Sequence, residues 1–239
     1  MSRNASRFAA IGLLLVGGGL VFRTNRAQAE ANTADLVTKV VAAADPEVLL
    51  PSSTPSVAAT ESVVFAGGCF WGVQAVFQHT KGVVTARSGY AGGDKSTAIY
   101  EVVSSGRTGH AEAVKVVYDP SKVSYQTLLN IFFTVAHDPT QVNMQGPDHG
   151  TQYRSAIFTA SADQMKTTED YIANMGKAKV YNKPIATEVG PLKAFYEAEG
   201  YHQDYATVHP NDMYIVINDA PKVENLKKMF PTFYRSEIK

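Results

Sequence analysis

Apolar and polar residues follow two different periods along this chain, and together these periods predict a mixed α/β domain. Short β-branched or alternating runs predict buried strands, whereas apolar residues spaced three or four apart predict helices. The predicted strands cover residues 62–66, 82–93, 100–103, 111–118, 155–159 and 185–189. One predicted helix begins after Cys69, and three others cover residues 125–135, 162–179 and 219–230. A further helix is expected from Glu199.

The first 60 residues have a different pattern from the rest of the chain. Arg3 and Arg7 precede an apolar run over residues 8–22 that is too short to span a bilayer comfortably, and Ala27-Gln28-Ala29 then forms a small-x-small cleavage site. This order predicts a signal peptide over residues 1–29, or an N-terminal anchor if it is not cleaved. We therefore expect an exported protein, in the periplasm or another extracytoplasmic compartment.

Residues 30–60 are rich in Ala, Ser, Thr and Pro, which predicts a flexible tether with at most one short helix over residues 34–44. The remaining residues, 61–239, suit a single catalytic domain with one core. The whole chain has 22 basic and 22 acidic residues, and cleavage after residue 29 would leave 18 basic against 22 acidic. Because no basic stripe is present, we expect no nucleic-acid partner. We also expect a monomer.

The candidate chemistry centres on the stretch Gly67-Gly68-Cys69-Phe70-Trp71-Gly72, which holds the only cysteine and the only tryptophan of the chain. Cys69 lies between a predicted strand and a predicted helix, where unpaired N–H groups and the helix dipole favour the nucleophilic thiolate. The alternative is that a lone cysteine is a small buried hydrophobe. With one cysteine an internal disulfide is impossible, and an exported free thiol is unusual unless it is used.

Two further residues are candidates for proton transfer. Glu112 is flanked by Ala111 and Ala113 in a predicted strand, so poor solvation would raise its pKa as a general acid requires. The alternative is an outward-facing residue of an alternating strand. Tyr90 lies between glycines, where backbone turns would position its side chain, although a hydroxyl in water fits the pattern equally.

The segment from Asn143 to Arg154 is polar and rich in turn-forming residues, which is typical of a binding loop on a rigid scaffold, although a purely structural loop has the same composition. Several histidines are candidate bases for Cys69: His110, His137, His149, His202 and His209. No two of them have metal-binding spacing with a thiolate partner, so we expect no zinc site.

Five motifs follow one another in an order that is specific to one family. They are Gly-Cys69-Phe-Trp-Gly, Ser88-Gly89-Tyr90-Ala91-Gly92-Gly93, Thr108-Gly109-His110-Ala111-Glu112, Gly146-Pro147-Asp148 with Gln152-Tyr153-Arg154-Ser155, and Tyr201-His202-Gln203-x-Tyr205. Over about residues 63–230 the chain resembles the A-type peptide methionine sulfoxide reductases. The resemblance implies an α/β (α+β) fold, a two-layer sandwich with a ferredoxin-like core and extensive loops. It also implies reduction of methionine S-sulfoxide, in proteins and as the free amino acid, for repair of oxidised proteins.

The resemblance also implies roles for individual residues. Cys69 would attack the sulfoxide sulfur and become a sulfenic acid as methionine leaves, while Glu112, Tyr90 and Tyr153 would bind and protonate the oxygen. The residue chemistry agrees, because a sulfoxide oxygen leaves only when it is protonated and therefore requires neutral acids.

A second group of residues would bind the substrate. Phe70 and Trp71 would form the apolar pocket for the S-methyl group, and Asp148 would hold the substrate backbone or an ordered water. His202 and Tyr205 would complete the wall of the pocket. Aromatic faces beside hydrogen-bond donors suit a methyl group next to a polar S=O bond.

The chain departs from many family members in having no resolving cysteine, either in its C-terminal segment or at Ser104. We therefore expect no bound cofactor and an external thiol reductant, either a thioredoxin-like protein, glutaredoxin with glutathione, or a periplasmic thiol carrier. Two rival functions also fit a lone cysteine. A cysteine hydrolase would pair Cys69 with His110, His149 or His202, and a non-catalytic thiol sensor would bind oxidised proteins without turnover.

Overall fold

The structure, a computed structural model, describes residues 35, 38–39 and 60–238. The chain divides into two units, Met1–Asp35 and Leu36–Lys239. Asp35, Thr38 and Lys39 are helical and exposed. The predicted signal peptide over residues 1–29 and most of the predicted tether lie outside the described residues. None of the helices in the described part of the chain is long and apolar enough to cross a membrane.

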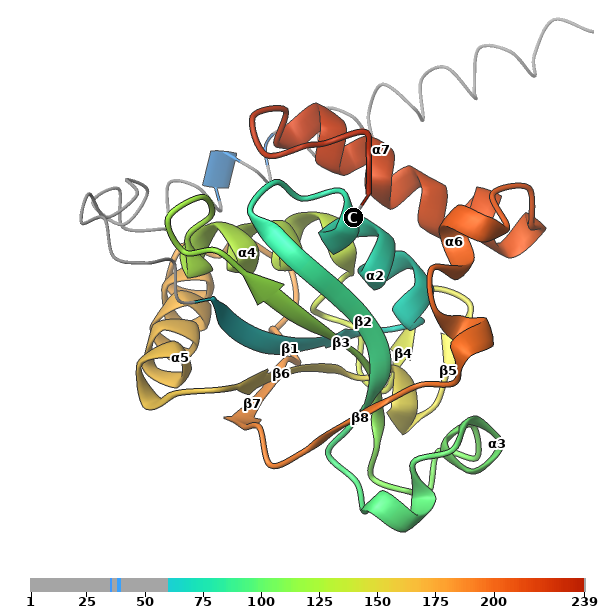
Figure 1. The fold of residues 1–239 in the computed structure, drawn as a ribbon. Helices are drawn as coiled ribbons and strands as arrows, with labels where there is room; N and C mark the ends of the chain where they lie inside the picture. The colour runs from blue at the N-terminus through green and yellow to red at the C-terminus, as the bar shows by residue number, and fades with distance from the viewer. Residues whose placement is uncertain (1–34, 36–37, 40–59, 239) are drawn as a thin grey trace, which may run out of the picture. The chain divides into compact units, whose positions relative to one another are not determined.

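A curled six-stranded sheet carries the domain, with the strands in the order β7-β6-β1-β3-β2-β8 (Figure 1). Its strands are β1 (Glu61–Gly67), β2 (Val83–Ala91), β3 (Ala111–Tyr118), β6 (Ser155–Thr159), β7 (Glu188–Pro191) and β8 (Phe195–Glu197). Neighbouring strands are antiparallel, except for β6 and β7, which are parallel. A separate two-stranded hairpin consists of β4 (Met144–Gln145) and β5 (Asp148–His149).

The helices, in chain order, are α2 (Phe70–Gln78), α3 (Tyr100–Val103), α4 (Tyr125–Ile131), α5 (Ala162–Lys177), α6 (Tyr205–Val208) and α7 (Ala220–Met229). Two π-helical turns extend them: η3 (Phe132–Ala136) continues α4, and η6 (Ile215–Asp219) precedes α7. Short 3₁₀ turns are η2 (Lys95–Thr97), η4 (Thr151–Tyr153) and η5 (Gly200–His202). Ser124 and Ser161 cap α4 and α5 through their side chains, as their positions before apolar-periodic runs predict.

The predicted fold class is confirmed. The central strands have the order β6-β1-β3-β2, and α2 connects β1 to β2 while β3 lies between them. In the same way α4 connects β3 to β6, and β1 lies between these two strands. Two interleaved split β-α-β units of this kind are the ferredoxin-like arrangement that we expected.

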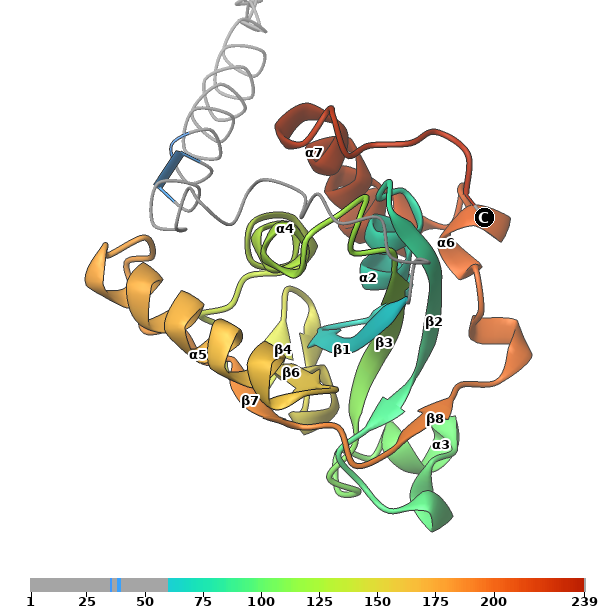
Figure 2. The ribbon, with the colours of Figure 1, turned by 60° about the vertical axis from the view of Figure 1, so that its left-hand side comes forward.

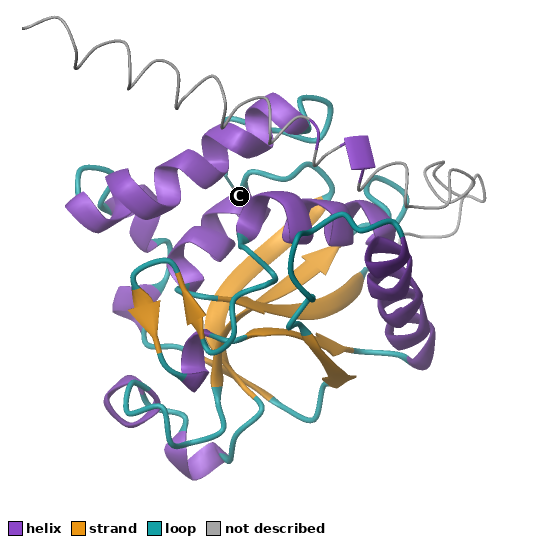
Figure 3. Cartoon of the chain, turned by 180° about the vertical axis from the view of Figure 1, so that it is seen from behind, coloured by secondary structure: helices purple, strands orange, loops and turns teal. Residues whose placement is uncertain are grey.

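The main core lies between the sheet and its helical layer (Figures 2 and 3). Side chains of β1 alternate between two faces, as a strand requires. Val63 and Phe65 join the main core beneath α2 and α4, whereas Val64 and Ala66 join a smaller cluster on the opposite face, which Phe195 covers. The strand β1 is therefore buried on both faces, and only Gly68 separates it from Cys69.

Two sequence predictions are wrong in detail. Residues 100–103 form the helical turn α3 and no strand, because the N–H groups of Val102 and Val103 both bond to the carbonyl of Ile99. The last predicted strand, residues 185–189, lies further along the chain as β7, residues 188–191. Its position is set by parallel pairing with β6, a long-range contact that a local pattern does not contain.

Candidate active site

Cys69 lies at the start of α2, directly after β1 and a two-glycine turn. Gly68 has a φ of +89°, a conformation that side chains rarely adopt, so glycine is required for the chain to turn from strand to helix here. Cys69 is the N-cap residue, and its side chain caps no backbone group. The thiol is 8% exposed, and the backbone N–H of Trp71 faces it. The predicted placement of the cysteine at a helix start is therefore confirmed.

The predicted lowering of its thiol pKa is wrong. Burial raises the pKa of Cys69 well above its ordinary value, and the nearby carboxyl groups of Glu112 and Asp219 raise it further. The Trp71 N–H and the Lys222 ammonium lower the pKa, but they do not outweigh burial. Desolvation of a thiolate is the stronger effect at this helix start. The resting side chain is a protonated thiol.

Glu112 lies in β3 next to the first residue of α2. Its side chain is buried, and its Oε2 accepts a hydrogen bond from the backbone N–H of Phe70 at 3.2 Å. Burial raises the pKa of Glu112 to about 8, against the lowering effect of that hydrogen bond. The predicted raised pKa is confirmed, and the alternative of an outward-facing glutamate is excluded. At neutral pH Glu112 is mainly a neutral acid that can donate a proton.

Aromatic rings surround the start of α2. The rings of Trp71 and Tyr205 stack with their centroids 3.8 Å apart and 11° between their planes. Phe70 is buried, and its ring lies 5.0 Å from that of His202. The indole N–H of Trp71 donates to Nδ1 of His202 at 3.3 Å. These four predicted substrate-binding residues therefore form one continuous aromatic surface beside Cys69.

The segment that carries His202 and Tyr205 is held in place by two glutamines. The Gln203 side chain donates to the carbonyls of Ser88 and Ala198, and it accepts from the N–H of Ser88 at 3.1 Å. Gln74, in α2, accepts from the backbone N–H of Asp204 at 3.0 Å. Since Gln74 lies on the helix that Cys69 begins, these bonds fix Tyr205 relative to the thiol.

Asp148 and Tyr153 come from the polar loop predicted to form a binding surface. Asp148 lies in β5, and its Oδ2 accepts a hydrogen bond from the hydroxyl of Tyr214. Tyr153 ends the turn η4, and burial raises the pKa of its phenol, with further contributions from Glu112 and Cys69. Tyr153 is therefore within electrostatic range of both groups. The structure thus brings this loop to the thiol.

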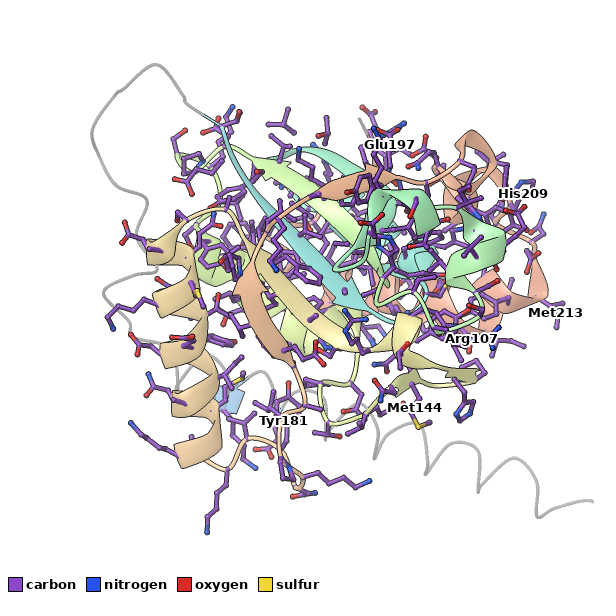
Figure 4. The ribbon with its side chains drawn as sticks, turned by 90° about the horizontal axis from the view of Figure 1, so that it is seen from below. Arg107, Met144, Tyr181, Glu197, His209 and Met213 are labelled. Carbon is purple, nitrogen blue, oxygen red and sulfur yellow. The ribbon has the colours of Figure 1, made fainter. Side chains whose placement is uncertain are left out.

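Two tyrosines at the site were not predicted from the sequence. Burial raises the pKa of Tyr100, as do the charges of Glu112 and Cys69. Burial also raises the pKa of Tyr214, with Cys69 as the next cause, and the Tyr214 ring packs edge-on against Trp71. The sequence pattern does not mark Tyr100 as a site residue, because it predicts a strand over residues 100–103. Tyr214 lies in the C-terminal segment, where no local pattern marks it; its neighbour Met213 points outward and is 68% exposed (Figure 4).

Tyr90, a further predicted donor to the sulfoxide oxygen, has a hydrogen-bond partner within the protein. Tyr90 lies in β2 directly opposite Glu112 and is fully buried, but its hydroxyl donates to Oε2 of Glu199 at 2.8 Å. Glu199 also accepts from the backbone N–H of Tyr100 at 2.9 Å. Tyr90 therefore holds Glu199, which in turn holds the start of α3. Its hydroxyl is thus engaged by Glu199.

In the described part of the chain no histidine side chain is hydrogen-bonded to the thiol. His110 bonds to Gly93 and Asp94, and His137 bonds to Ser155 and Phe132, while burial lowers the pKa of His137 to about 4. His149 is exposed. The geometry gives no support to a cysteine hydrolase. Among the described residues no group of three His, Cys, Asp or Glu side chains is arranged to hold a metal ion.

The site holds one sulfur atom beside a neutral carboxylic acid, a combination that is typical of thiol-dependent enzymes. A family model described as peptide methionine sulfoxide reductase matches residues 61–233. The peptide methionine sulfoxide reductase MsrA 2 of Mesorhizobium japonicum is 58% identical over 175 residues, which cover 73% of this chain and 90% of that protein. The MsrA 2 of Synechocystis sp. is 46% identical over 186 residues, 78% of this chain and 87% of that protein.

Solved structures agree with these relatives. The reduced form of Mxr1 from Saccharomyces cerevisiae has a TM-score of 0.59 at 34% identity, over 68% of this chain and 93% of that one. Methionine sulfoxide reductase A of Corynebacterium diphtheriae has a TM-score of 0.56 at 33% identity, over 70% and 91%. The chain belongs to the peptide methionine sulfoxide reductase family, and its relatives are of the A type. It is an oxidoreductase that reduces methionine sulfoxide and serves protein repair.

Proposed function

We propose that Cys69 carries the reaction alone, as the nucleophile that removes oxygen from methionine S-sulfoxide. The observation that carries the proposal is the position of Cys69, the only cysteine of the chain, at the start of α2 beside Glu112. Sγ of Cys69 attacks the sulfoxide sulfur, the sulfoxide S–O bond breaks and a Cys69 S–O bond forms. Methionine leaves, and one proton remains on the new sulfenic acid, so the thiol proton balances the step.

Glu112 is the proton donor in this proposal. Its carboxyl is neutral near pH 7, and Tyr100 and Tyr153 are phenols coupled to both Glu112 and Cys69. When the sulfoxide oxygen takes the proton of Glu112, the resulting Glu112 carboxylate can accept the proton of the Cys69 thiol. Cys69 is thus deprotonated during the reaction although its pKa is raised. We propose Tyr100 in place of Tyr90 as the second hydrogen-bond donor, because the Tyr90 hydroxyl is bonded to Glu199.

Phe70, Trp71, Tyr205 and His202 are proposed to bind the methyl side of the substrate. Their rings form the aromatic surface beside Cys69, while Asp148, oriented by the Tyr214 hydroxyl, supplies a polar group for the substrate backbone or an ordered water. An apolar wall opposite hydrogen-bond donors distinguishes the methyl from the oxygen of a sulfoxide. Such a pocket is chiral and accepts one sulfoxide epimer, and the family resemblance implies the S epimer.

Recycling of the enzyme requires thiols from outside this chain. A first thiol attacks Sγ of the sulfenic acid and water leaves, which forms a mixed disulfide; a second thiol then releases Cys69 as a thiol and leaves an oxidised disulfide. We propose a thioredoxin-like protein or glutaredoxin with glutathione as the source. Measuring turnover with each purified system, in place of dithiothreitol, distinguishes them.

The deciding experiment compares the 61–239 domain with its Cys69→Ser variant. Both are incubated with a peptide containing methionine S-sulfoxide and dithiothreitol, with the R epimer and free methionine S-sulfoxide as parallel substrates. We expect wild type to consume the S epimer and the serine variant to be inactive. One turnover without dithiothreitol, followed by dimedone, should add a single label to Cys69. Loss of the S epimer without a label on Cys69 would contradict the sulfenic acid step.

We further propose that the protein is exported. The support is the basic start, the apolar run over residues 8–22 and the Ala27-Gln28-Ala29 site. The test is N-terminal sequencing of the protein from fractionated cells. A mature protein that begins at Glu30 in an extracytoplasmic fraction supports cleavage, whereas an intact N-terminus in the membrane fraction supports an anchor. An intact protein in the cytosol overturns the proposal.

A further inference from the structure

Asp219 is the last residue of the π-helical turn η6, which continues directly into α7, and its side chain is buried. Its Oδ1 accepts from Nζ of Lys222 at 3.0 Å, while Oδ2 has no hydrogen-bond partner although the side chain is fully buried. A buried carboxylate with so few partners is costly, so this arrangement requires a reason.

The Asp219–Lys222 ion pair lies against the first turn of α2. A Cβ atom on Gly72 would lie 2.1 Å from Oδ1 of Asp219 and 2.8 Å from Nζ of Lys222. Gly72 is three residues after Cys69, in the first turn of α2. The absent side chain of Gly72 therefore allows the ion pair to contact this turn, and both η6 and α7 pack on α2 (Figures 1 and 2).

Other titratable groups around the start of α2 interact electrostatically with Cys69. They are Glu112 from β3, Tyr100 from α3, Tyr153 from η4, Tyr205 from α6, Tyr214 before η6, Asp219 from η6 and Lys222 from α7. Near pH 7 the phenols are neutral and Glu112 is mainly protonated. Asp148 of β5 acts on Glu112 and Asp219, whereas the Asp219–Lys222 pair supplies the ionic charge that acts on the thiol itself.

We propose that the Asp219–Lys222 pair, packed against the first turn of α2, is a positioning unit for Cys69, in which the carboxylate of Asp219 opposes ionisation of the thiol and the ammonium of Lys222 favours it. The inference rests on the proposed function in taking Cys69 as the reactive thiol. Its electrostatics agree with the geometry, because Asp219 raises the pKa of Cys69 more than Lys222 lowers it. A protonated thiol reacts slowly with electrophiles and oxidants. The pair thus limits other reactions of Cys69 until a bound sulfoxide allows the thiol proton to pass to Glu112.

Alkylation of Cys69 by iodoacetamide across pH 6–11 tests the pair without requiring any sulfoxide reduction. Since the chain has one cysteine, mass spectrometry of the intact protein counts the label unambiguously. Asp219→Asn should move the pH midpoint of alkylation down by about one unit and so raise the rate at pH 8 about tenfold. Lys222→Gln should move the midpoint upward, because Asp219 remains ionised at the alkaline pH where Cys69 titrates. Lys222→Arg retains the cation and should restore the wild-type profile.

Glu224→Gln and Lys227→Gln, both on exposed positions of α7, are the matched charge controls and should alkylate as wild type does. Thermal unfolding identifies any variant that fails to fold. Because the two variants are expected to shift the alkylation midpoint in opposite directions, one folded variant is enough to test the proposal. Wild-type midpoints in both variants, or shifts of the same sign, would overturn the proposal. A wild type without sulfoxide turnover but with these two shifts would instead overturn the proposed function and leave the inference intact.

Discussion

The backbone N–H of Phe70 donates to Oε2 of Glu112 at 3.2 Å, so the residue next to the thiol is bonded to the buried acid of β3. This bond joins the start of α2 to a strand more than 40 positions later in the chain. It also leaves one carboxyl oxygen, Oε1, without a hydrogen bond to the protein among the described residues. The bond therefore fixes the distance between nucleophile and proton donor before a substrate arrives.

Replacing Glu112 by Gln should remove the proton donor while keeping an oxygen that accepts from Phe70. We expect kcat/KM for a sulfoxide peptide to fall about 10²- to 10⁴-fold, the usual contribution of general acid catalysis. Because the carboxyl donates only while protonated, wild-type activity should decline as pH rises through about 8, the pKa of Glu112. This decline should be absent from the residual activity of Glu112→Gln. A wild-type profile that is flat from pH 6 to 9 would contradict the assigned role.

The same variant should be more stable than wild type at alkaline pH. The pKa of Glu112 is raised to about 8 in the folded protein, against about 4.3 in an unfolded chain. The stabilisation from its protonated form is complete below the unfolded value and is lost as pH rises through about 8. Glutamine carries no such loss, so Glu112→Gln should melt about 2–4 °C or more above wild type at pH 9. Melting curves at pH 5 and pH 9 provide the comparison.

Two tyrosine-to-phenylalanine variants separate proton donation from structural support. Tyr100→Phe should lower kcat/KM about tenfold or more, because Tyr100 is coupled to Cys69 and Glu112. Tyr90→Phe loses the bond to Glu199, which should cost about 1 kcal/mol of stability and change activity by less than about threefold. Steady-state kinetics and thermal unfolding of both variants give the two readouts. The reverse order of activity loss would restore Tyr90 as the donor.

Trp71, the only tryptophan of the chain, should report the protonation of His202 through its fluorescence. The indole N–H donates to Nδ1 of His202, so protonation at that nitrogen breaks the bond. Burial lowers the pKa of His202 below its ordinary value of 6.5, and the change should therefore occur on the acid side of pH 6.5. His202→Asn should abolish the transition. A His110→Asn variant, which leaves this pair intact, is the control.

Two glycine-to-alanine substitutions should change stability in opposite directions. Gly72→Ala places a methyl group 2.1 Å from Oδ1 of Asp219 and should destabilise the fold by about 1–3 kcal/mol. Gly176 lies in α5 with nothing within 4 Å of an added Cβ, so Gly176→Ala should stabilise the fold by about 0.5–1 kcal/mol. Urea unfolding of the two variants measures the difference. A stable Gly72→Ala protein would mean that α7 lies further from α2 than the structure shows.

The periodic pattern of the sequence predicted the strands at residues 62–66, 111–118 and 155–159 and the long helices closely, because their apolar positions are local. It did not predict α3, since the turn over residues 100–103 depends on hydrogen bonds to Ile99 and on Glu199, almost 100 residues away. Nor did it predict β7, which is aligned by pairing with β6.

At the site, the sequence by itself determined the single thiol, its place at a helix start, the acid in the neighbouring strand and the aromatic pair after the cysteine. Only the tertiary structure decided that Tyr100 and Tyr214 face the thiol, that the Tyr90 hydroxyl is engaged by Glu199, and that Asp219 and Lys222 act on Cys69. The reason is physical: local spacing fixes which residues share an element. Burial and long-range packing decide which charges meet, and burial here outweighs the helix start in setting the thiol pKa.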